Sequence, residues 1–310
     1  MAEPVLAFDL QGHRGARGLL PENTLAGFAL AASIGVTTLE TDLAVTSDDI
    51  VVLSHDPMLN PDLTRDEHGT WLAARGPAIR SLTLAELRRF DVGRINPTSN
   101  YARQFPDQAP VDGARIPTLD ELFAATGAAT TVGGNALRYS IEIKTSPERP
   151  DETPDPQSFA RRVVEVVRRA GLQSRTTIQA FDWRALLAAK TIAPEIETSC
   201  LTIESAGRNN IQAAAGKPSP WLGGLALETH GGSVPRLVAA AGCGTWSPYW
   251  RNLDHALVGV AKGLGLKVVP WTLNAPQDMA EVIAMGVDGL ISDDPERARK
   301  LLAEQGIAVR

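Results

Sequence analysis

The chain has 310 residues, of which 44% are hydrophobic and 21% are charged, so it is long enough for one large α/β barrel or two modest domains. Its formal net charge of −6 argues against nucleic acid as a partner, and an anionic substrate must therefore be attracted by local positive charge. No apolar run approaches the roughly 18 residues of a membrane span, which argues against stable membrane insertion.

One pattern recurs along the chain: an amphipathic helix, a glycine and then a strand. Residues 25–32 carry apolar side chains at helical spacing and are followed by Gly35 and a strand. A glycine after each helix suits the left-handed helix end that the next loop needs. Alternation of helices with eight strands favours a TIM-type (β/α)8 barrel, predicted as a single domain over residues 1–310, although residues 225–227 compete as a strand. The eight parallel strands are predicted at residues 5–12, 37–43, 138–144, 176–181, 197–202, 244–249, 267–273 and 289–292.

Irregular segments follow two of these strands. Residues 47–49 form a turn signal between β-like runs, which predicts a hairpin whose return arm brings His55 back toward the end of the second strand. Residues 57–115 then form a long insertion after the second strand, with one predicted helix near residues 84–90. An insertion of this size on the catalytic face of a barrel is usually functional. Residues 146–156 are rich in proline and acidic residues and predict a mobile loop.

Three carboxylates lie near the ends of two predicted strands. Glu40 and Asp42 occupy positions i and i+2, so both point to one face, and Glu142 and Lys144 repeat the arrangement. In an antiparallel protein this pattern would indicate a solvent-exposed face. Both faces of a parallel barrel are covered, so its inward charges need a partner or a function. Glu40, Asp42 and Glu142 therefore predict a site for a hard divalent cation, Ca²⁺ or Mg²⁺.

Two of the five histidines accompany this cluster. His13 and His55 follow or end strand-like runs at the same end of the barrel. Imidazole suits proton transfer near neutral pH, so both are candidate acid/base residues, whereas a structural hydrogen bond would be the better interpretation of a lone histidine. His68, His230 and His255 lack such neighbours and are interpreted as structural or surface residues.

Arg14 and Lys144 supply positive charge beside the cluster. A guanidinium presents a fork to phosphate oxygens and an ammonium a point charge, although either residue could instead form a buried structural ion pair. Trp271 lies near the end of a late strand, where a substrate-facing wall is favoured over core packing. A metal site with acid/base partners and phosphate-binding charges suits the cleavage of a phosphodiester.

In its ordered motifs the chain resembles the glycerophosphodiester phosphodiesterase family. The motifs cover nearly the whole chain, and the set in this order is far more specific than any single motif. The segment 57–115 also resembles the family's own insertion. The motifs are His13-Arg14-Gly15, Pro21-Glu22-Asn23-Thr24, Glu40-Thr41-Asp42, His55-Asp56, Ile141-Glu142-Ile143-Lys144, Trp271-Thr272-Leu273-Asn274 and Gly286-Val287-Asp288-Gly289-Leu290-Ile291-Ser292-Asp293.

The resemblance implies a TIM-type barrel, a divalent metal and hydrolysis of small glycerophosphodiesters to glycerol 3-phosphate and an alcohol. It implies that Glu40, Asp42 and Glu142 hold the metal. It also implies an acid/base pair in His13 and His55, and phosphate binding by Arg14 and Lys144. The family's cyclic-phosphate route, in which a glycerol hydroxyl is the nucleophile, and direct attack by water both agree with these residues.

Two rival functions are weaker. A phospholipase C- or D-like enzyme acting on intact lipids should expose aromatic or apolar residues around its mouth, but aromatic residues make up only 5% of the chain. A non-catalytic barrel that binds phosphorylated metabolites has no need of both histidines and all three carboxylates.

For the cellular compartment, the sequence indicates only a preference between an exported and a cytoplasmic location. Residues 1–9 contain neither a basic n-region nor an uninterrupted apolar h-region, so no signal peptide is expected there. A trimmed exported form would look the same, and periplasmic or secreted location is slightly favoured over cytoplasmic. Cys200 and Cys243 could be two buried thiols or a disulfide, and their spacing leaves both alternatives open.

Overall fold

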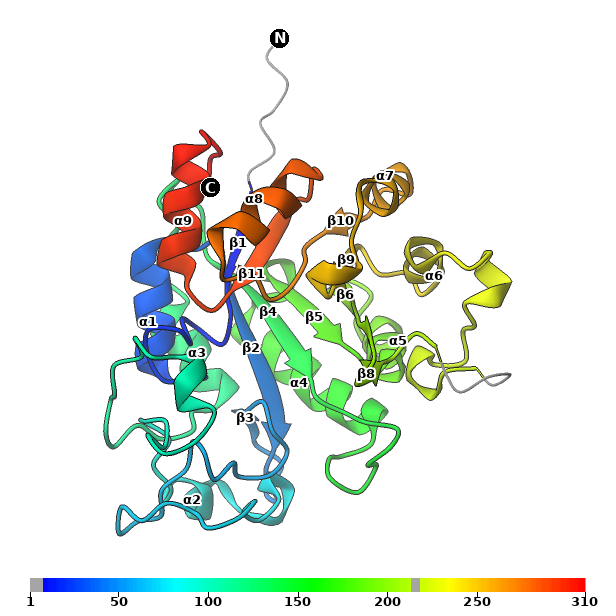
Figure 1. Cartoon of the computed structure of the whole chain (residues 1–310). Coiled ribbons are helices and arrows are strands. Elements are labelled where there is room, and N and C mark those ends of the chain that lie inside the picture. Colours follow the sequence, from blue (N-terminus) through cyan, green and yellow to red (C-terminus); the bar gives the residue numbers. More distant parts are fainter. Residues whose placement is uncertain (1–7, 213–217, 310) are drawn as a thin grey trace.

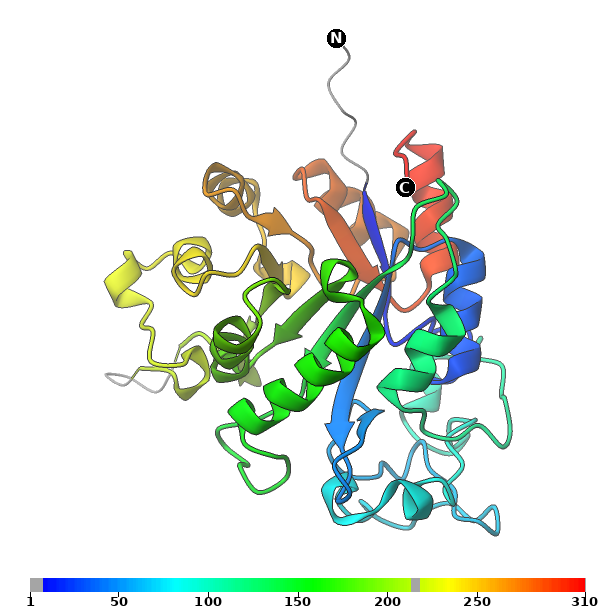
Figure 2. The same cartoon turned by 180° about the vertical axis from the view of Figure 1, so that it is seen from behind.

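Eight parallel strands form the wall of a barrel, and helices cover its outside (Figures 1 and 2). The computed structural model describes residues 8–212 and 218–309. Neighbouring strands follow the order β10-β9-β6-β5-β4-β2-β1-β11, and the prediction of a TIM-type barrel is confirmed. The strands are β1 (Asp9–Gly12), β2 (Thr38–Val45), β4 (Arg138–Ile143), β5 (Thr176–Ala180), β6 (Glu197–Thr202), β9 (Thr245–Pro248), β10 (Lys267–Val268) and β11 (Gly289–Ser292).

The barrel is nearly closed between β10 and β11. The backbone N–H of Asp288 donates to the carbonyl of Val268 at 2.9 Å, and the N–H of Ile291 donates to the carbonyl of Pro270 at 2.9 Å. Proline has no N–H, so the ladder of β10 stops before this residue. The strand predicted over residues 267–273 is therefore shorter than expected.

The helices begin and end as the repeated pattern predicts. The side chain of Thr24 caps α1 by accepting from the N–H of Gly27, and Gly35 ends the helix with a φ of 90°. None of the helices within residues 8–212 and 218–309 is long and apolar enough to cross a membrane. The helices around the barrel are α1 (Leu25–Ile34), α3 (Leu119–Thr126), α4 (Pro156–Ala170), α5 (Trp183–Ile192), α6 (Val234–Ala240), α7 (His255–Gly263), α8 (Pro276–Ala284) and α9 (Pro295–Glu304).

The register of the strands decides which side chains meet inside the barrel. Asp42 of β2 lies beside Glu142 of β4, which in turn lies beside Gln179 of β5. Leu39 and Leu43 occupy the other face of β2 and are fully buried in the main hydrophobic core. Alternation along each strand thus sends apolar residues outward under the helices and gathers polar residues at the centre.

The insertion packs on a hairpin at the end of β2. The short strand β3 (Val51–Leu53) pairs antiparallel with β2, which confirms the predicted hairpin. Helix α2 (Leu84–Leu87) is shorter than the predicted helix at residues 84–90. A second hydrophobic cluster joins the hairpin to the insertion through Ala44, Val52, Leu59, Ile79, Leu87 and Ile116.

Residues 225–227 lie in a loop rather than a strand, and the part of the first predicted strand before residue 8 lies outside the described residues. After β6, strands β7 (Glu204–Ser205) and β8 (Arg208–Asn209) form a small antiparallel ribbon. Single turns of 3₁₀ helix lie at Ile79–Ser81, Ala102–Gln104, Gln173–Arg175, Pro220–Leu222, Glu228–His230 and Trp250–Asn252.

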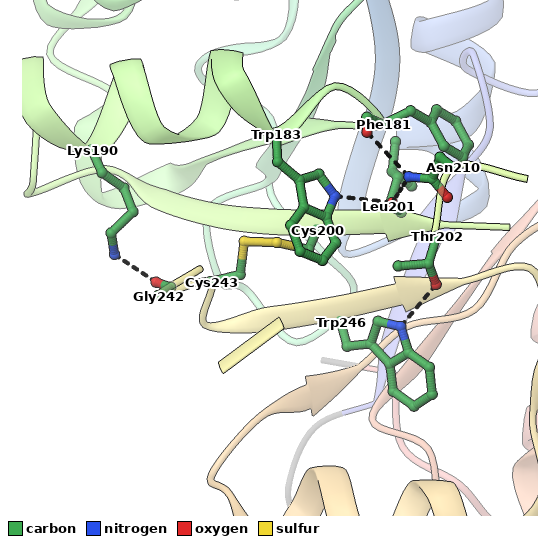
Figure 3. The surroundings of a disulfide bond; sticks show 10 residues. All are labelled: Phe181, Trp183, Lys190, Cys200, Leu201, Thr202, Asn210, Gly242, Cys243 and Trp246. Carbon is green, nitrogen blue, oxygen red and sulfur yellow. Dashed lines mark hydrogen bonds between the residues drawn. A yellow bond between two sulfur atoms is a disulfide. The ribbon is translucent and has the colours of Figure 1, made fainter. Parts of the chain in front are cut away.

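A disulfide joins Cys200 of β6 to Cys243, which lies just before β9 (Figure 3). The two Cα atoms are 6.0 Å apart. Trp183 lies beside the bond, and its Nε1 donates to the carbonyl of Leu201 at 3.3 Å (Figure 3). Of the two alternatives that the sequence left open for these cysteines, the structure has the disulfide, which joins β6 to the loop before the neighbouring strand β9.

Candidate active site

Three acidic side chains meet inside the barrel where β2 and β4 end. Glu40 and Asp42 come from β2 and Glu142 from β4, and one oxygen from each lies within 4.8 Å of the others. Their exposed fractions are 2%, 1% and 6%, so the cluster is buried. This all-oxygen set matches the ligands of Ca²⁺ or Mg²⁺ rather than those of softer metals.

The ionisation of these carboxyl groups also fits a bound cation. Burial, with Asp42 beside it, raises the pKa of Glu40 well above its usual value. Burial raises the pKa of Glu142 to about 7, although Lys144 opposes the shift. Burial acts in the same direction on Asp42, but Arg14 and Lys144 outweigh it and hold the pKa of Asp42 well below its usual value. Protonation of Glu40 and Glu142 thus reduces the repulsion among the three carboxylates. A bound divalent cation would reduce the same repulsion and replace these protons.

Arg14 and Lys144 are both paired with acidic residues of the site. Lys144 Nζ lies 2.9 Å from Glu142 Oε1 and 3.5 Å from Asp42 Oδ1. Arg14 Nε lies 3.1 Å from Asp42 Oδ2, and its Nη1 donates to Glu22 at 2.8 Å. The two cations therefore lie beside the candidate metal ligands, and the buried ion pairs that the sequence left as an alternative are formed.

His13 follows β1 and is held by an acidic residue that follows β11. Its Nδ1 lies 2.6 Å from Asp293 Oδ1, and its Nε2 lies 3.9 Å from Glu40 Oε2. Arg17 donates to both oxygens of Asp293, and Asn274 donates to Oδ2 at 2.7 Å. These contacts fix the ring so that Nε2 faces the carboxylates. Burial, together with Arg17, lowers the pKa of His13 to about 4.

His55 reaches the same site from the hairpin, as predicted. The backbone N–H of Ser54 donates to the carbonyl of Asp42 at 2.9 Å, which fixes the return arm. His55 Nδ1 lies 3.1 Å from Asp56 Oδ1, and Asn60 donates to Asp56 Oδ2 at 2.8 Å. Burial and two nearby cations lower the pKa of His55 to about 4. Both site histidines are therefore neutral near pH 7 in this state and can accept a proton.

The other three histidines have the surface or structural positions expected of them. His68 and His255 are exposed. His230 is half-buried, and its Nδ1 lies 2.8 Å from the carbonyl oxygen of Ala226.

Trp271 belongs to an aromatic cluster at the mouth of the barrel. Its ring centroid lies 5.3 Å from that of Phe181 and 5.5 Å from that of Tyr249. Its Nε1 donates to the carbonyl of Ser247 at 3.0 Å. Phe181 lines the cavity beside the carboxylates, whereas Trp271 contacts Phe181 and is not itself among the residues that line this cavity.

A cavity of about 440 Å³ opens beside the carboxylate cluster. Its inner end is lined by His55, Glu142, Lys144 and Phe181. Its outer wall comes from the insertion, from the loop after β4 and from the segment that contains β7 and β8. A cavity of this size next to the ionisable groups suits a small-molecule substrate.

Sequence reasoning missed several polar contacts of the site. Gln179, on the inner face of β5, donates to Glu40 Oε1 at 2.8 Å. Asp293 directly follows a strand, so the rule that placed the other candidates at strand ends also applies to it. Tyr101 of the insertion donates its hydroxyl proton to Glu22. The insertion has no regular repeat, so no pattern in the sequence indicates this last contact.

A model of the glycerophosphoryl diester phosphodiesterase family matches residues 13–297 of the chain. A glycerophosphodiester phosphodiesterase from Caldanaerobacter subterraneus subsp. tengcongensis is 26% identical over 294 residues, which cover 95% of this chain and 97% of the relative.

Two solved structures share the fold over nearly the whole chain. One is a candidate glycerophosphoryl diester phosphodiesterase from Silicibacter pomeroyi, with a TM-score of 0.86 and 33% identity, covering 99% of this chain and 97% of the other. The other is an Oleispira antarctica phosphodiesterase in complex with the product sn-glycerol-3-phosphate. It has a TM-score of 0.67 and 23% identity, covering 96% of this chain and 97% of the other, and its likeness shows the fold alone.

Proposed function

The chain is an enzyme of the glycerophosphoryl diester phosphodiesterase family, and we propose that it hydrolyses glycerophosphodiesters to glycerol 3-phosphate and an alcohol with a divalent metal and two histidines. The observation that carries this proposal is the meeting of three buried carboxylates with two histidines at one end of the barrel. The product named for the Oleispira antarctica phosphodiesterase supports the choice of glycerol 3-phosphate.

Glu40, Asp42 and Glu142 are the proposed metal ligands, and the proposed ion is Mg²⁺ or Ca²⁺. Their oxygens converge within 4.8 Å, and their mutual repulsion favours a bound cation. A bound divalent ion would polarise a phosphoryl oxygen and stabilise the charge that develops there.

His13 and His55 are the proposed acid/base pair. His55 lines the cavity, so we assign to it the proton that the leaving alcohol oxygen must gain. The negative charge of a bound phosphodiester favours the protonated form of this imidazole. Nε2 of His13, whose ring is held by Asp293, accepts the proton of the nucleophile, either water or a glycerol hydroxyl.

Arg14 and Lys144 are proposed to hold the phosphate, and their substitution tests this role. Lys144→Met should lower kcat as well as raise KM, because the charge that accumulates on the phosphoryl oxygens loses a partner. Arg14→Lys should also be damaging, since a point charge cannot reproduce the fork. Steady-state kinetics and thermal melting of each variant provide the measurement.

Lys262→Met is the control for these variants, because Lys262 pairs with Asp288 away from the carboxylate cluster. It should leave kcat/KM unchanged. A wild-type kcat/KM in both Lys144→Met and Arg14→Lys, with only a lower melting temperature, would assign the two cations to structural ion pairs.

Small soluble diesters should be better substrates than intact lipids. The cavity is lined mainly by charged and polar side chains, which suit a hydrated head group better than acyl chains. The measurement is kcat/KM for glycerophosphocholine and glycerophosphoethanolamine against phosphatidylcholine and phosphatidylinositol vesicles. A clear preference for vesicles would favour the phospholipase alternative, and binding without turnover would favour the non-catalytic barrel.

An oxidising compartment, periplasmic or extracellular, is proposed for this protein. The bond between Cys200 and Cys243 supports the proposal, because structural disulfides persist in such compartments and are rare in a reducing cytosol. Non-reducing peptide mapping of protein isolated from its native cell should recover the two cysteines as one linked peptide. Two free thiols in protein from the cytosolic fraction would contradict it.

A further inference from the structure

The cavity extends well beyond the groups that act on the phosphate. His55, Glu142 and Lys144 line only its inner end. Arg75 of the insertion and Arg208 of β8 line its outer part. His55 is the proposed donor of a proton to the leaving alcohol, and the cavity continues past it. The head group would therefore lie in this outer part.

Two arginines of the outer cavity have no acidic partner within residues 8–212 and 218–309. Neither Arg75 nor Arg208 forms an ion pair with a carboxylate in that part of the chain. The guanidinium of Arg208 is held against Phe181, with its Cζ 5.4 Å from the ring centroid. Lys144 Nζ lies 5.9 Å from the same centroid, so Arg208 and the proposed phosphate-binding lysine lie beside the same aromatic ring. Its N–H donors remain available to a ligand.

The acidic side chains of the outer cavity are already engaged. Glu152 pairs with Arg149, with an N–O distance of 3.4 Å. Glu148 accepts from Trp221 Nε1 at 3.4 Å. The ring of Phe181 already lies beside two cationic side chains, those of Lys144 and Arg208. It is therefore a poor site for a quaternary ammonium group, which aromatic rings otherwise bind. Beyond the paired His55 and Asp56, three arginines (Arg75, Arg149 and Arg208) line the outer cavity against two glutamates, so its charge balance is positive.

We propose that the outer cavity selects glycerophosphodiesters whose head group carries an acidic group, a carboxylate or a phosphate, through Arg208 and Arg75. The proposal rests on the proposed function and specifies its substrate class. A guanidinium binds either anion through paired N–H donors, and the interaction is local enough to act in a protein of net charge −6.

Matched pairs of substrates test the proposal. Glycerophosphoserine and glycerophosphoethanolamine differ by one carboxylate, and glycerophosphoglycerol with and without a terminal phosphate differ by one phosphate. For the wild-type enzyme, kcat/KM should be higher for the acidic member of at least one pair, and that pair identifies the anion. Arg208→Gln should reduce this preference about 3- to 10-fold, the effect of a partly solvated charge pair, while kcat/KM for glycerophosphoethanolamine stays near wild type. Arg75→Gln should act in the same direction.

Arg251→Gln is the matched control, because Arg251 also lies over an aromatic ring, that of Trp250, but does not line the cavity. It should leave the preference unchanged. Equal kcat/KM within both pairs, or a preference that survives Arg208→Gln and Arg75→Gln together, would overturn the proposal. A preference for cationic head groups that is lost in Glu148→Gln would overturn it in favour of the opposite selectivity. Failure of every glycerophosphodiester to react would instead contradict the proposed function.

Discussion

Exhaustive chelation with EDTA is expected to abolish hydrolysis of glycerophosphodiesters, and added Mg²⁺ or Ca²⁺ should restore it. Burial and mutual repulsion raise the pKa of Glu40 well above its usual value and that of Glu142 to about 7, so the cluster carries its full negative charge only with a cation. The returning metal should also raise the melting temperature, because it binds the folded chain alone. Activity assays and elemental analysis of the same samples provide the measurement.

Two glutamates allow the metal effect to be separated from a general loss of charge. Glu142→Gln removes a proposed ligand, and the neutral amide resembles the protonated acid, so the fold should persist while the metal-induced rise in melting temperature is lost. Glu148→Gln changes an exposed glutamate of the same cavity and should keep the metal response. Full activity in a protein shown to contain no metal would exclude the assignment of the carboxylates.

His13→Ala and His55→Ala should each lower kcat by about 10²- to 10⁴-fold, the usual contribution of a positioned acid or base. The His13 imidazole is buried and that of His55 is half-buried at the cavity, and Nδ1 of each is held by a carboxylate. His68→Ala, an exposed change, should stay close to wild type. Near-normal turnover in either site variant would remove that residue from the mechanism.

Asp293 is proposed to act through His13 rather than on the substrate. Asp293→Asn should lower kcat by roughly 10- to 100-fold with little change in KM, because the ring loses the partner that fixes its tautomer. The neighbouring Asp294 caps α9 instead, and Asp294→Asn should keep both kcat and the helix, since asparagine is also a good cap. Equal effects of the two substitutions would indicate a structural role for Asp293.

The fold and most of the site follow from local rules of the sequence. Alternation along a strand places Glu40 and Asp42 on one face, and the parallel register then brings Glu142 beside them. The turn after β2 returns His55 because a tight hairpin has a fixed register. These features depend on neighbours in sequence or on the barrel's own regularity, which explains why they were predictable.

Other features depend on contacts that no local pattern encodes. Pairing of Cys200 with Cys243 depends on β6 lying beside β9, the strand that follows Cys243. The bond between Tyr101 and Glu22 depends on how the insertion folds over the mouth. The early end of β10 at Pro270 could have been predicted, since proline lacks the donor that a central strand needs.

We propose that this site cleaves the bond between phosphorus and the head-group oxygen of a glycerophosphodiester. Phosphorus NMR of glycerophosphoethanolamine, incubated with the metal-loaded enzyme, tests it most directly. The predicted result is conversion to glycerol 3-phosphate in the wild type and in Asp294→Asn, with little or none in Glu142→Gln or His55→Ala. Release of phosphoethanolamine, or an unchanged substrate signal in the wild type, would contradict the claim.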